Sequence, residues 1–265
     1  MRQLNQSGLI TPEQMDRWSI GIIGTGAIGS FTAMALTKMG FKNIATWDDD
    51  TIEDHNIANQ MFPVGDVGKK KAIATREMVK QFSGENIVSL SIRATAKKVY
   101  NFLRSTFPGT NTMILLCVDS LDVRKAIAEE LAKEYGIFVL DARMGAKTYR
   151  VLGFDSADAD SIEAYMKTFV ADKDAVQERC GQKSIIYTVL GVAAELCSFV
   201  HKTITPNNMG GHNMPPEVIF DYGAGIRIQR RIITDLVKLD DLPDTPEAEA
   251  APESANAEQT AEVPF

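Results

Sequence analysis

The feature that most constrains this chain is a glycine cluster between two short apolar runs, within residues 19–50 (SIGIIGTGAIGSFTAMALTKMGFKNIATWDDD). Gly24, Gly26 and Gly29 follow the first run with the spacing G-x-G-x-x-G, and helix-forming residues come next. The second apolar run ends at Asp48, 19 residues after Gly29. This order predicts a buried strand, a tight turn, an α-helix and a second strand that ends in an acid.

Such a unit suits a nucleotide site. Glycines permit the tight turn and the close approach of backbone to phosphate, and the amino end of the helix offers free N–H groups to the phosphate charge. The acid at the end of the second strand is placed to meet ribose hydroxyls. The alternative is a glycine-tight turn that binds nothing, and the motif by itself does not distinguish NAD, FAD and ATP.

Charge is distributed unevenly along the 265 residues, which are 45% hydrophobic and 24% charged in all. The formal charge of −7 arises at the carboxyl end, where residues 239–265 hold eight acids and no Lys or Arg. The remaining residues carry 28 basic and 27 acidic side chains, and this near-neutral balance argues against nucleic acid as the main partner. We expect a single domain over residues 1–238 and a disordered acidic Pro/Ala/Glu tail over 239–265.

Cysteine usage and hydropathy indicate the compartment. Cys117, Cys180 and Cys197 cannot form a disulfide framework, and without a CxxC pair a structural zinc site is not expected. Residues 1–18 contain no apolar core of signal-peptide length, so we expect a cytoplasmic protein without membrane spans. The apolar segment 184–202 is a little short for a membrane span and contains an acid, which favours a buried or dimer-interface helix.

Strand and helix patterns alternate over about 140 residues, which predicts an α/β fold with a doubly wound, mostly parallel sheet of the Rossmann-like, nucleotide-binding kind. Beyond the glycine unit, helices are expected over 69–82, 98–103, 121–135 and 162–169, and strands over 87–92, 112–118, 137–140 and 148–154. Two paired strands, 218–222 and 226–230, are expected around a glycine-rich turn.

Polar residues gather where the predicted strands end. They are Asp48, Asp50, Asn56, Asn59, Gln60, Lys71 and Asp119. Each has a structural alternative, since Asp119 could cap a helix, Lys71 could begin a solvated one, and the two asparagines could be turn residues. A dehydrogenase would use the glycines and Asp48 but has no evident use for the others.

Four ordered motifs carry a family resemblance. They are GTGAIG, D-x-D-T-I-x-x-x-N-x-x-x-Q over 48–60, DVGKKK over 66–71 and CVDSLDVRKAI over 117–127. Together they resemble the ThiF/MoeB/HesA family, relatives of the adenylating domain of ubiquitin-activating enzymes, in a branch without the zinc motifs. The resemblance covers roughly residues 18–202.

The resemblance implies an enzyme that uses ATP and Mg²⁺ to adenylate a carboxyl-terminal carboxylate, usually that of a ubiquitin-like or sulfur-carrier protein. It implies that Gly24, Gly26 and Gly29 border the phosphates, that Asp48 holds the ribose, that Asp50, Asn56, Asn59 and Gln60 line the nucleotide pocket, that Lys71 contacts phosphate and that Asp119 ligates Mg²⁺. These residue types fit the chemistry, because a carboxylate that attacks a phosphate brings anion to anion and needs cations and oriented donors.

The chain departs from the family pattern just before Gln60, where the family commonly has Arg and this chain has Asn59. A guanidinium fork holds phosphate more strongly than a neutral amide, so either another cation substitutes or adenylation is weak. Arg2 resembles a family arginine that often reaches across a dimer, though at a shorter spacing to the glycines. Cys180 falls where some members carry a transfer cysteine, and adjacent basic residues would favour its thiolate. The alternative is a passive loop cysteine.

The leading hypothesis is a homodimeric ATP-dependent adenylyltransferase acting on a small ubiquitin-like or sulfur-carrier protein, with transfer to Cys180 or an external thiol as an open further step. One alternative keeps the fold and activates the carboxylate of a modified tRNA nucleoside. Another is a nucleotide-binding scaffold subunit whose activity has decayed at Asn59. An NAD-dependent oxidoreductase explains only the glycines and Asp48. Arg143 and Lys147 follow another predicted strand and are weaker site candidates.

Overall fold

The computed structural model describes residues 8–169, 184–205 and 217–230. Arg2, Cys180 and the acidic tail 239–265 lie outside these residues, so the expectations for them stay untested. The strands are β1 (Trp18–Ile23), β2 (Ile44–Trp47), β3 (Val88–Leu90), β4 (Asn111–Leu116), β5 (Ile137–Met144), β6 (Thr148–Asp155), β7 (Glu217–Asp221) and β8 (Ile226–Arg230). The α-helices are α1 (Pro12–Asp16), α2 (Ala27–Met39), α3 (Lys71–Ser83), α4 (Ala96–Thr106), α5 (Leu121–Leu131), α6 (Ala159–Met166) and α7 (Ile186–Ile204).

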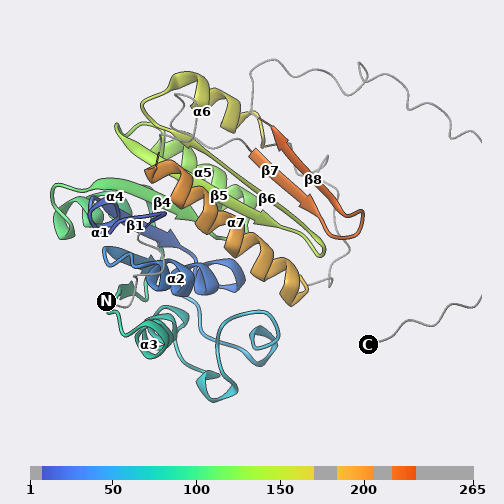
Figure 1. Cartoon of the computed structure of the whole chain (residues 1–265). Coiled ribbons are helices and arrows are strands. Elements are labelled where there is room, and N and C mark those ends of the chain that lie inside the picture. The colour runs from blue at the N-terminus through green and yellow to red at the C-terminus, as the bar shows by residue number, and fades with distance from the viewer. Residues whose placement is uncertain (1–7, 170–183, 206–216, 231–265) are drawn as a thin grey trace, which may run out of the picture. The chain divides into compact units, whose positions relative to one another are not determined.

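All eight described strands form one sheet in the order β3-β2-β1-β4-β5-β6-β7-β8 (Figure 1). The strands from β3 to β5 pair in parallel, and β6, β7 and β8 extend the sheet in antiparallel fashion. The predicted α/β fold with a mostly parallel sheet is confirmed. The chain moves outward from β1 to β2 and β3, then returns to the other side of β1 as β4. Ligands of open α/β sheets bind at such a reversal, beyond the carboxyl ends of the strands.

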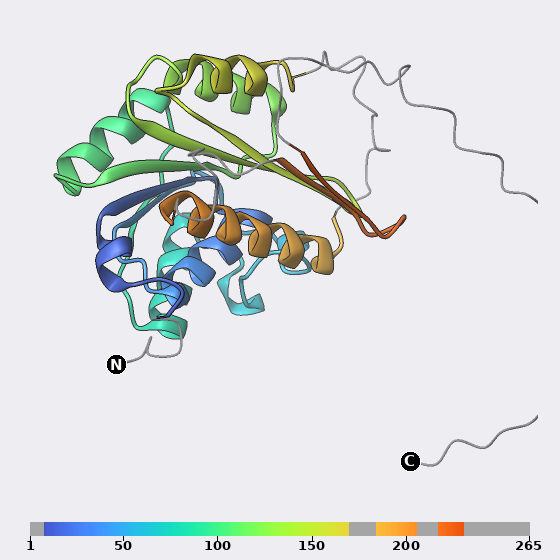
Figure 2. The same ribbon diagram turned by 45° about the horizontal axis from the view of Figure 1, so that its top comes forward.

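Helices cover both faces of the sheet (Figure 2). Side chains of α2 and α7 pack on one face, where Leu36 and Val192 join the core with Ile20 and Leu115. Side chains of α4, α5 and α6 pack on the other face, where Tyr165 lies in the second core. Strands buried on both faces read as unbroken apolar runs, which is why β1 and β4 could be recognised in the sequence.

Several elements differ from their predicted bounds. β5 continues past its predicted end at residue 140 as far as Met144, because β6 pairs with it from Phe138 onward and supplies backbone partners up to Met144. α5 ends at Leu131 rather than at residue 135. α4 is longer than expected, since the Thr95 side chain caps it before Ala96. A one-sequence pattern shows neither the antiparallel partner nor these helix ends.

The long apolar helix α7 has one buried face and one partly exposed face. One face, which includes Val192, Leu196 and Phe199, is buried against the sheet and α2. Leu190 and Tyr187 remain 49% and 39% exposed on the other face. The expectation of a buried helix is thus confirmed for one face. Among the described residues, no helix has the length and hydropathy that a membrane crossing requires.

Candidate functional site

Each glycine of the turn between β1 and α2 has its own structural reason. Gly24 has φ +89°, a backbone conformation that side chains rarely adopt. A Cβ on Gly29 would lie 1.9 Å from the carbonyl oxygen of Gly24, so no larger residue fits there. A Cβ on Gly26 would meet only Gln60 Nε2, at 3.8 Å. The first and third glycines therefore build the turn, and the second leaves open space beside it.

The amino end of α2 opens onto that space. Gly26 is the N-cap residue, and no side chain caps the helix there. The N–H groups of a helix's first turn have no partner within the helix, so they are available to an anion. The turn also borders β4, because a Cβ on Gly24 would lie 2.8 Å from the Cys117 carbonyl oxygen. The turn therefore lies at the reversal between β1 and β4, where the fold places ligands.

Asp48, at the end of β2, fixes the glycine turn. Its Oδ2 accepts a hydrogen bond from the Thr25 N–H at 2.7 Å, and its Oδ1 accepts one from the Asp50 N–H at 2.9 Å. A carboxylate has about four acceptor positions, so capacity remains for a hydroxyl ligand. The structure thus brings Asp48 to the turn as predicted and gives it a structural role that the sequence did not indicate.

Two buried polar atoms beside the turn have no partner. Thr25 Oγ1 and Gln60 Oε1 make no hydrogen bond to any residue that the structure describes. Buried polar atoms are normally paired, because an unpaired one costs about 1–3 kcal/mol. Their position beside Gly26 fits a ligand with hydroxyl or phosphate groups. Together with the open position at Gly26, these atoms favour a turn that binds a ligand over one that is only tight.

The other amides of the 48–60 motif serve the loop itself. Asn56 is buried, and its Oδ1 accepts from the Glu53 N–H at 2.9 Å, which closes the 3-10 turn Asp54–Asn56. Asn59 Nδ2 donates to Ser184 Oγ at 3.4 Å, just before α7 begins. Asn59 therefore connects the loop to the segment that leads into α7.

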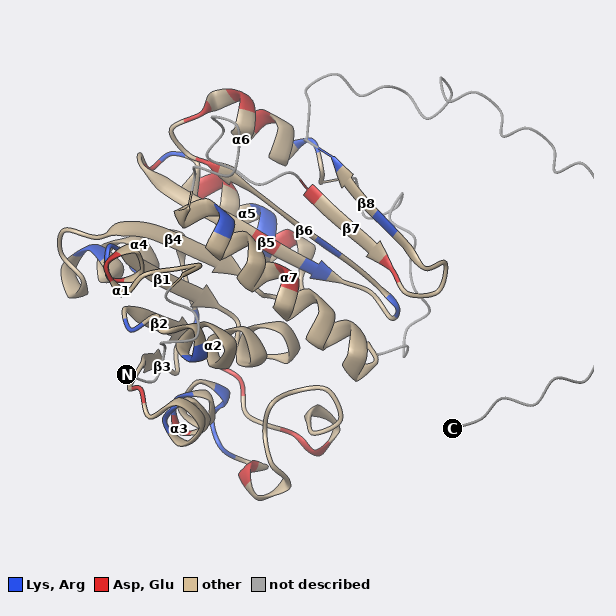
Figure 3. Cartoon of the chain, viewed as in Figure 1, with Lys and Arg blue, Asp and Glu red and all other residues tan. Residues whose placement is uncertain are grey.

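Lys71 begins α3 with its side chain largely buried, and its Nζ lies 2.8 Å from Asp50 Oδ2. The Lys71 N–H also donates to the Asp50 carbonyl at 3.0 Å, so the two residues are joined twice. Figure 3 shows the acids of the loop after β2 and the lysines that precede and begin α3. The alternative of a solvated lysine is wrong, because Lys71 is only 8% exposed.

Asp119 follows β4 and is exposed. Ser120, not Asp119, caps α5, since Ser120 Oγ accepts from the Val123 N–H at 3.3 Å. The Asp119 carboxylate makes no hydrogen bond or ion pair within the described part of the chain. A single free carboxylate suits Mg²⁺, which keeps several waters and commonly takes one or two protein carboxylates together with substrate phosphates.

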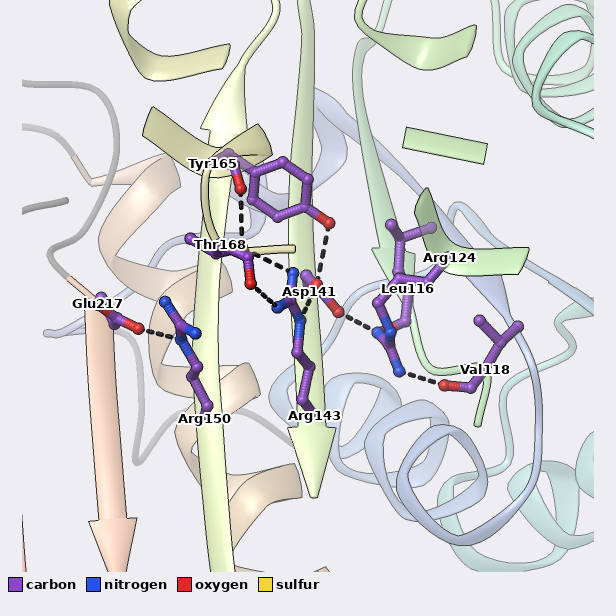
Figure 4. A network of polar contacts seen from close by, with 9 residues as sticks. All are labelled: Leu116, Val118, Arg124, Asp141, Arg143, Arg150, Tyr165, Thr168 and Glu217. Carbon is purple, nitrogen blue, oxygen red and sulfur yellow. Dashed lines mark hydrogen bonds and ion pairs between the residues drawn. The ribbon is translucent and has the colours of Figure 1, made fainter. Parts of the chain in front are cut away.

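Reasoning from the sequence missed a buried polar network around Asp141, which Figure 4 shows. Asp141 on β5 is fully buried and accepts from Arg143 Nε at 2.7 Å, from the Tyr165 hydroxyl at 2.9 Å and from Arg124 on α5. Arg143 also donates to the Thr168 carbonyl at 3.2 Å. Arg143, which we considered for a site role, thus serves this network. The available signal for this network in the sequence was Asp141, an acid that follows an apolar run.

Burial and the charge of Asp141 shift the pKa values of two groups in the network. Burial, followed by the charge of Asp141, raises the pKa of the Tyr165 hydroxyl well above its ordinary value, so it stays a donor. Burial opposes the charge on Arg143, but Asp141 and Tyr165 outweigh it and raise the pKa of the guanidinium. The two described cysteines are both buried in the core. Burial raises the pKa of both Cys117 and Cys197 to about 12, as expected of core thiols.

A model of the ThiF family matches residues 1–209. The chain belongs to the ThiF family. The motifs of the candidate site all lie inside the matched residues, and β7 and β8 follow beyond them.

Curated relatives of this ThiF-family chain are activating enzymes. Ubiquitin-like modifier-activating enzyme 5 of Oryza sativa subsp. japonica is 32% identical over 127 residues, which are 43% of this chain and 30% of that protein. Ubiquitin-like modifier-activating enzyme ATG7 of Candida glabrata is 26% identical over 185 residues, which are 65% of this chain and 29% of that protein. The chain thus spans less than a third of the length of these relatives.

Solved structures share the fold. E. coli MccB with MccA superposes with a TM-score of 0.67 at 15% identity, covering 86% of this chain and 67% of that one. PaaA superposes with a TM-score of 0.65 at 16% identity, covering 88% and 69%. E. coli MccB with ATP gives a TM-score of 0.62 at 15% identity, covering 85% and 67%. At these identities the likeness establishes the fold alone.

Proposed function

We propose that this chain is an ATP-dependent adenylyltransferase that activates the carboxyl-terminal carboxylate of a small ubiquitin-like or sulfur-carrier protein. The observation that carries the proposal is the pair of unpartnered buried atoms, Thr25 Oγ1 and Gln60 Oε1, beside an uncapped helix and an open glycine. Asp119 follows β4, whose end borders the glycine turn. These groups suit a triphosphate and its cation.

The proposed chemistry needs positioning more than acid–base catalysis. The substrate carboxylate attacks the α-phosphorus, one P–O bond forms to give the acyl-adenylate, and the bond to pyrophosphate breaks. The N–H groups at the start of α2 and the Lys71 ammonium would offset the phosphate charge. Asp119 would hold Mg²⁺, which when bound would neutralise charge on the phosphates. Asp48 and Gln60 would hold the ribose and orient the nucleotide.

The relatives support this choice of substrate. Those found among curated proteins are named for activating ubiquitin-like modifiers, and MccB has been solved with MccA and, in a separate structure, with ATP. We therefore propose a small protein or peptide tail as the partner, a cytoplasmic location and a homodimer to which Arg2 contributes. Cys180 or an external thiol would then attack the acyl carbon, forming a C–S bond and releasing AMP as the C–O bond of the anhydride breaks. These finer points go beyond the family membership.

A second candidate function is a nucleotide-binding scaffold with weak or no adenylation. Two observations favour it. Asn59 stands where the family commonly has Arg and is turned to Ser184, and the Lys71 ammonium is held by Asp50 at 2.8 Å. Nucleotide binding without pyrophosphate chemistry would follow if no other cation replaces the missing arginine and Lys71 does not reach the phosphates.

The test begins with the melting temperature of the full chain, titrated with ATP and Mg²⁺, NAD⁺ or NADP⁺, for wild type and Asp119→Ala. A ligand at one hundred times its dissociation constant stabilises by about 2.7 kcal/mol, or roughly 5–10 °C for a chain of this size. We expect ATP with Mg²⁺ to raise the melting temperature of wild type by this amount, and we expect most of that rise to be absent in Asp119→Ala.

Exchange of labelled pyrophosphate into ATP, with a panel of Gly-Gly-tailed carrier proteins, then separates the two candidates. Exchange with one carrier supports adenylation, and ATP binding without exchange across the panel supports the scaffold. A melting shift with NAD⁺ and none with ATP would overturn both. Asp119→Ala with undiminished exchange would refute the role given to Asp119.

A further inference from the structure

Arg124 on α5 is a cation whose guanidinium reaches back to the loop that carries Asp119 (Figure 4). The residue is only 3% exposed. Its NH1 donates to the Leu116 carbonyl at 2.9 Å, and its NH2 donates to the Val118 carbonyl. Leu116 ends β4, and Val118 directly precedes Asp119. One planar side chain therefore holds the backbone on both sides of the point where the chain leaves the sheet.

Asp141 sets the direction of that guanidinium. It pairs in register with Leu116 on the neighbouring strand and binds Arg124 NH1 with Oδ1. Its Oδ2 accepts from Arg143 and from Tyr165, so the carboxylate cannot turn without breaking other bonds. Helix α5, strand β5 and helix α6 thus meet at one buried carboxylate.

Stability alone does not account for this arrangement. Burying an Arg–Asp pair costs desolvation that its attraction barely repays, and apolar residues of the same volume often stabilise as well or better. Buried charges can instead fix one arrangement among several. The arrangement at stake here is the backbone path of the residues just before Asp119, because two of their carbonyls have Arg124 as a donor.

We infer that Arg124 is the positioning residue for Asp119 and that Asp141 orients Arg124 for this task. Arg124 touches no nucleotide in this scheme. It acts through the Leu116 and Val118 carbonyls, which set where the Asp119 carboxylate is presented to a divalent cation. The identity of the ligand in this inference rests on the proposed function, whereas the contacts of Arg124 do not depend on it.

Arg124→Lys is the informative variant, with Arg143→Lys as its matched control. Lysine keeps the charge beside Asp141 but offers a single nitrogen in place of the planar fork whose two nitrogens reach separate carbonyls. Both arginines bind Asp141, and only Arg124 binds the loop before Asp119. The readout is the Mg²⁺ concentration that gives half of the ATP-induced rise in melting temperature. Loss of a group that orients a metal ligand commonly weakens metal binding about 10–100-fold. We therefore expect the Mg²⁺ concentration for half of the rise to increase at least tenfold in Arg124→Lys and to change little in Arg143→Lys.

Two results would overturn the inference. One is an Arg124→Lys protein with a lower melting temperature and an unchanged Mg²⁺ requirement, and the other is an equal increase in both variants. Hydrogen exchange of the 116–122 backbone without nucleotide provides a measurement that does not depend on the function. Faster exchange there in Arg124→Lys than in Arg143→Lys supports positioning, and equal exchange refutes it. If wild type gives no response to ATP with Mg²⁺, the proposed function fails and exchange still decides the positioning.

Discussion

Replacing Gly29 by alanine tests the geometry of the glycine turn most sharply, because two effects of opposite sign compete. Alanine is a better helix former than glycine by up to about 1 kcal/mol, and Gly29 lies within α2. Its Cβ would, however, lie 1.9 Å from the Gly24 carbonyl oxygen and 3.3 Å from Cys117 Cβ. The first of these opposing atoms is backbone, so the turn and the helix must move apart.

The steric effect should prevail. Overpacking a closed site costs about 1–3 kcal/mol and sometimes more, and here the close contact is with an atom that no rotamer change can move. We expect Gly29→Ala to lower the free energy of unfolding by about 3 kcal/mol, or the melting temperature by roughly 6–12 °C. Urea unfolding and a thermal scan of the full chain measure both quantities.

Gly26→Ala is the matched control in the same turn. Its Cβ would meet only Gln60 Nε2, at 3.8 Å, so its stability should stay within about 1 kcal/mol of wild type. The added methyl group lies in the space proposed for phosphate, and the ATP-induced stabilisation should fall. A Gly29→Ala protein as stable as wild type, or more stable, would refute the close packing of α2 on the turn.

Two further predictions concern the charged and buried groups around the site. Lys71→Met should change the free energy of unfolding by less than about 1 kcal/mol, because its ion-pair partner Asp50 is 67% exposed. The same variant should reduce the ATP-induced rise in melting temperature, and Asp50→Asn serves as its control. A large loss of stability with ATP binding intact would contradict this. Burial raises the pKa of Cys117 from 9.0 to about 12. The contribution of the neutral thiol to the free energy of unfolding is therefore complete below pH 9 and is lost as the pH rises toward 12. Between pH 7 and pH 10, the free energy of unfolding measured with urea should fall by about 1 kcal/mol more in wild type than in Cys117→Ala, and equal losses would refute the closed surroundings of the thiol.

Much of the candidate site could be predicted because it depends on local rules. A glycine that must adopt positive φ, a capping serine and an acid after an apolar strand are all visible within a few residues. Gly24, Ser120 and Asp48 were placed correctly on that basis, and β7 and β8 were found from their alternation around a glycine-rich turn. The family could also be named, since four motifs in order constrain a chain more than any one of them.

The sequence alone therefore determined the fold class, the family and the position of the glycine turn, since these follow from short-range patterns. Only the tertiary structure decided which side chains meet. Arg124 and Asp141 are 17 positions apart and lie in different elements, and their contact depends on strand register and helix rotation. The same holds for Lys71 and Asp50, because a loop of 3-10 turns brings them together. Such contacts are set by packing across the sheet, which a linear pattern does not record.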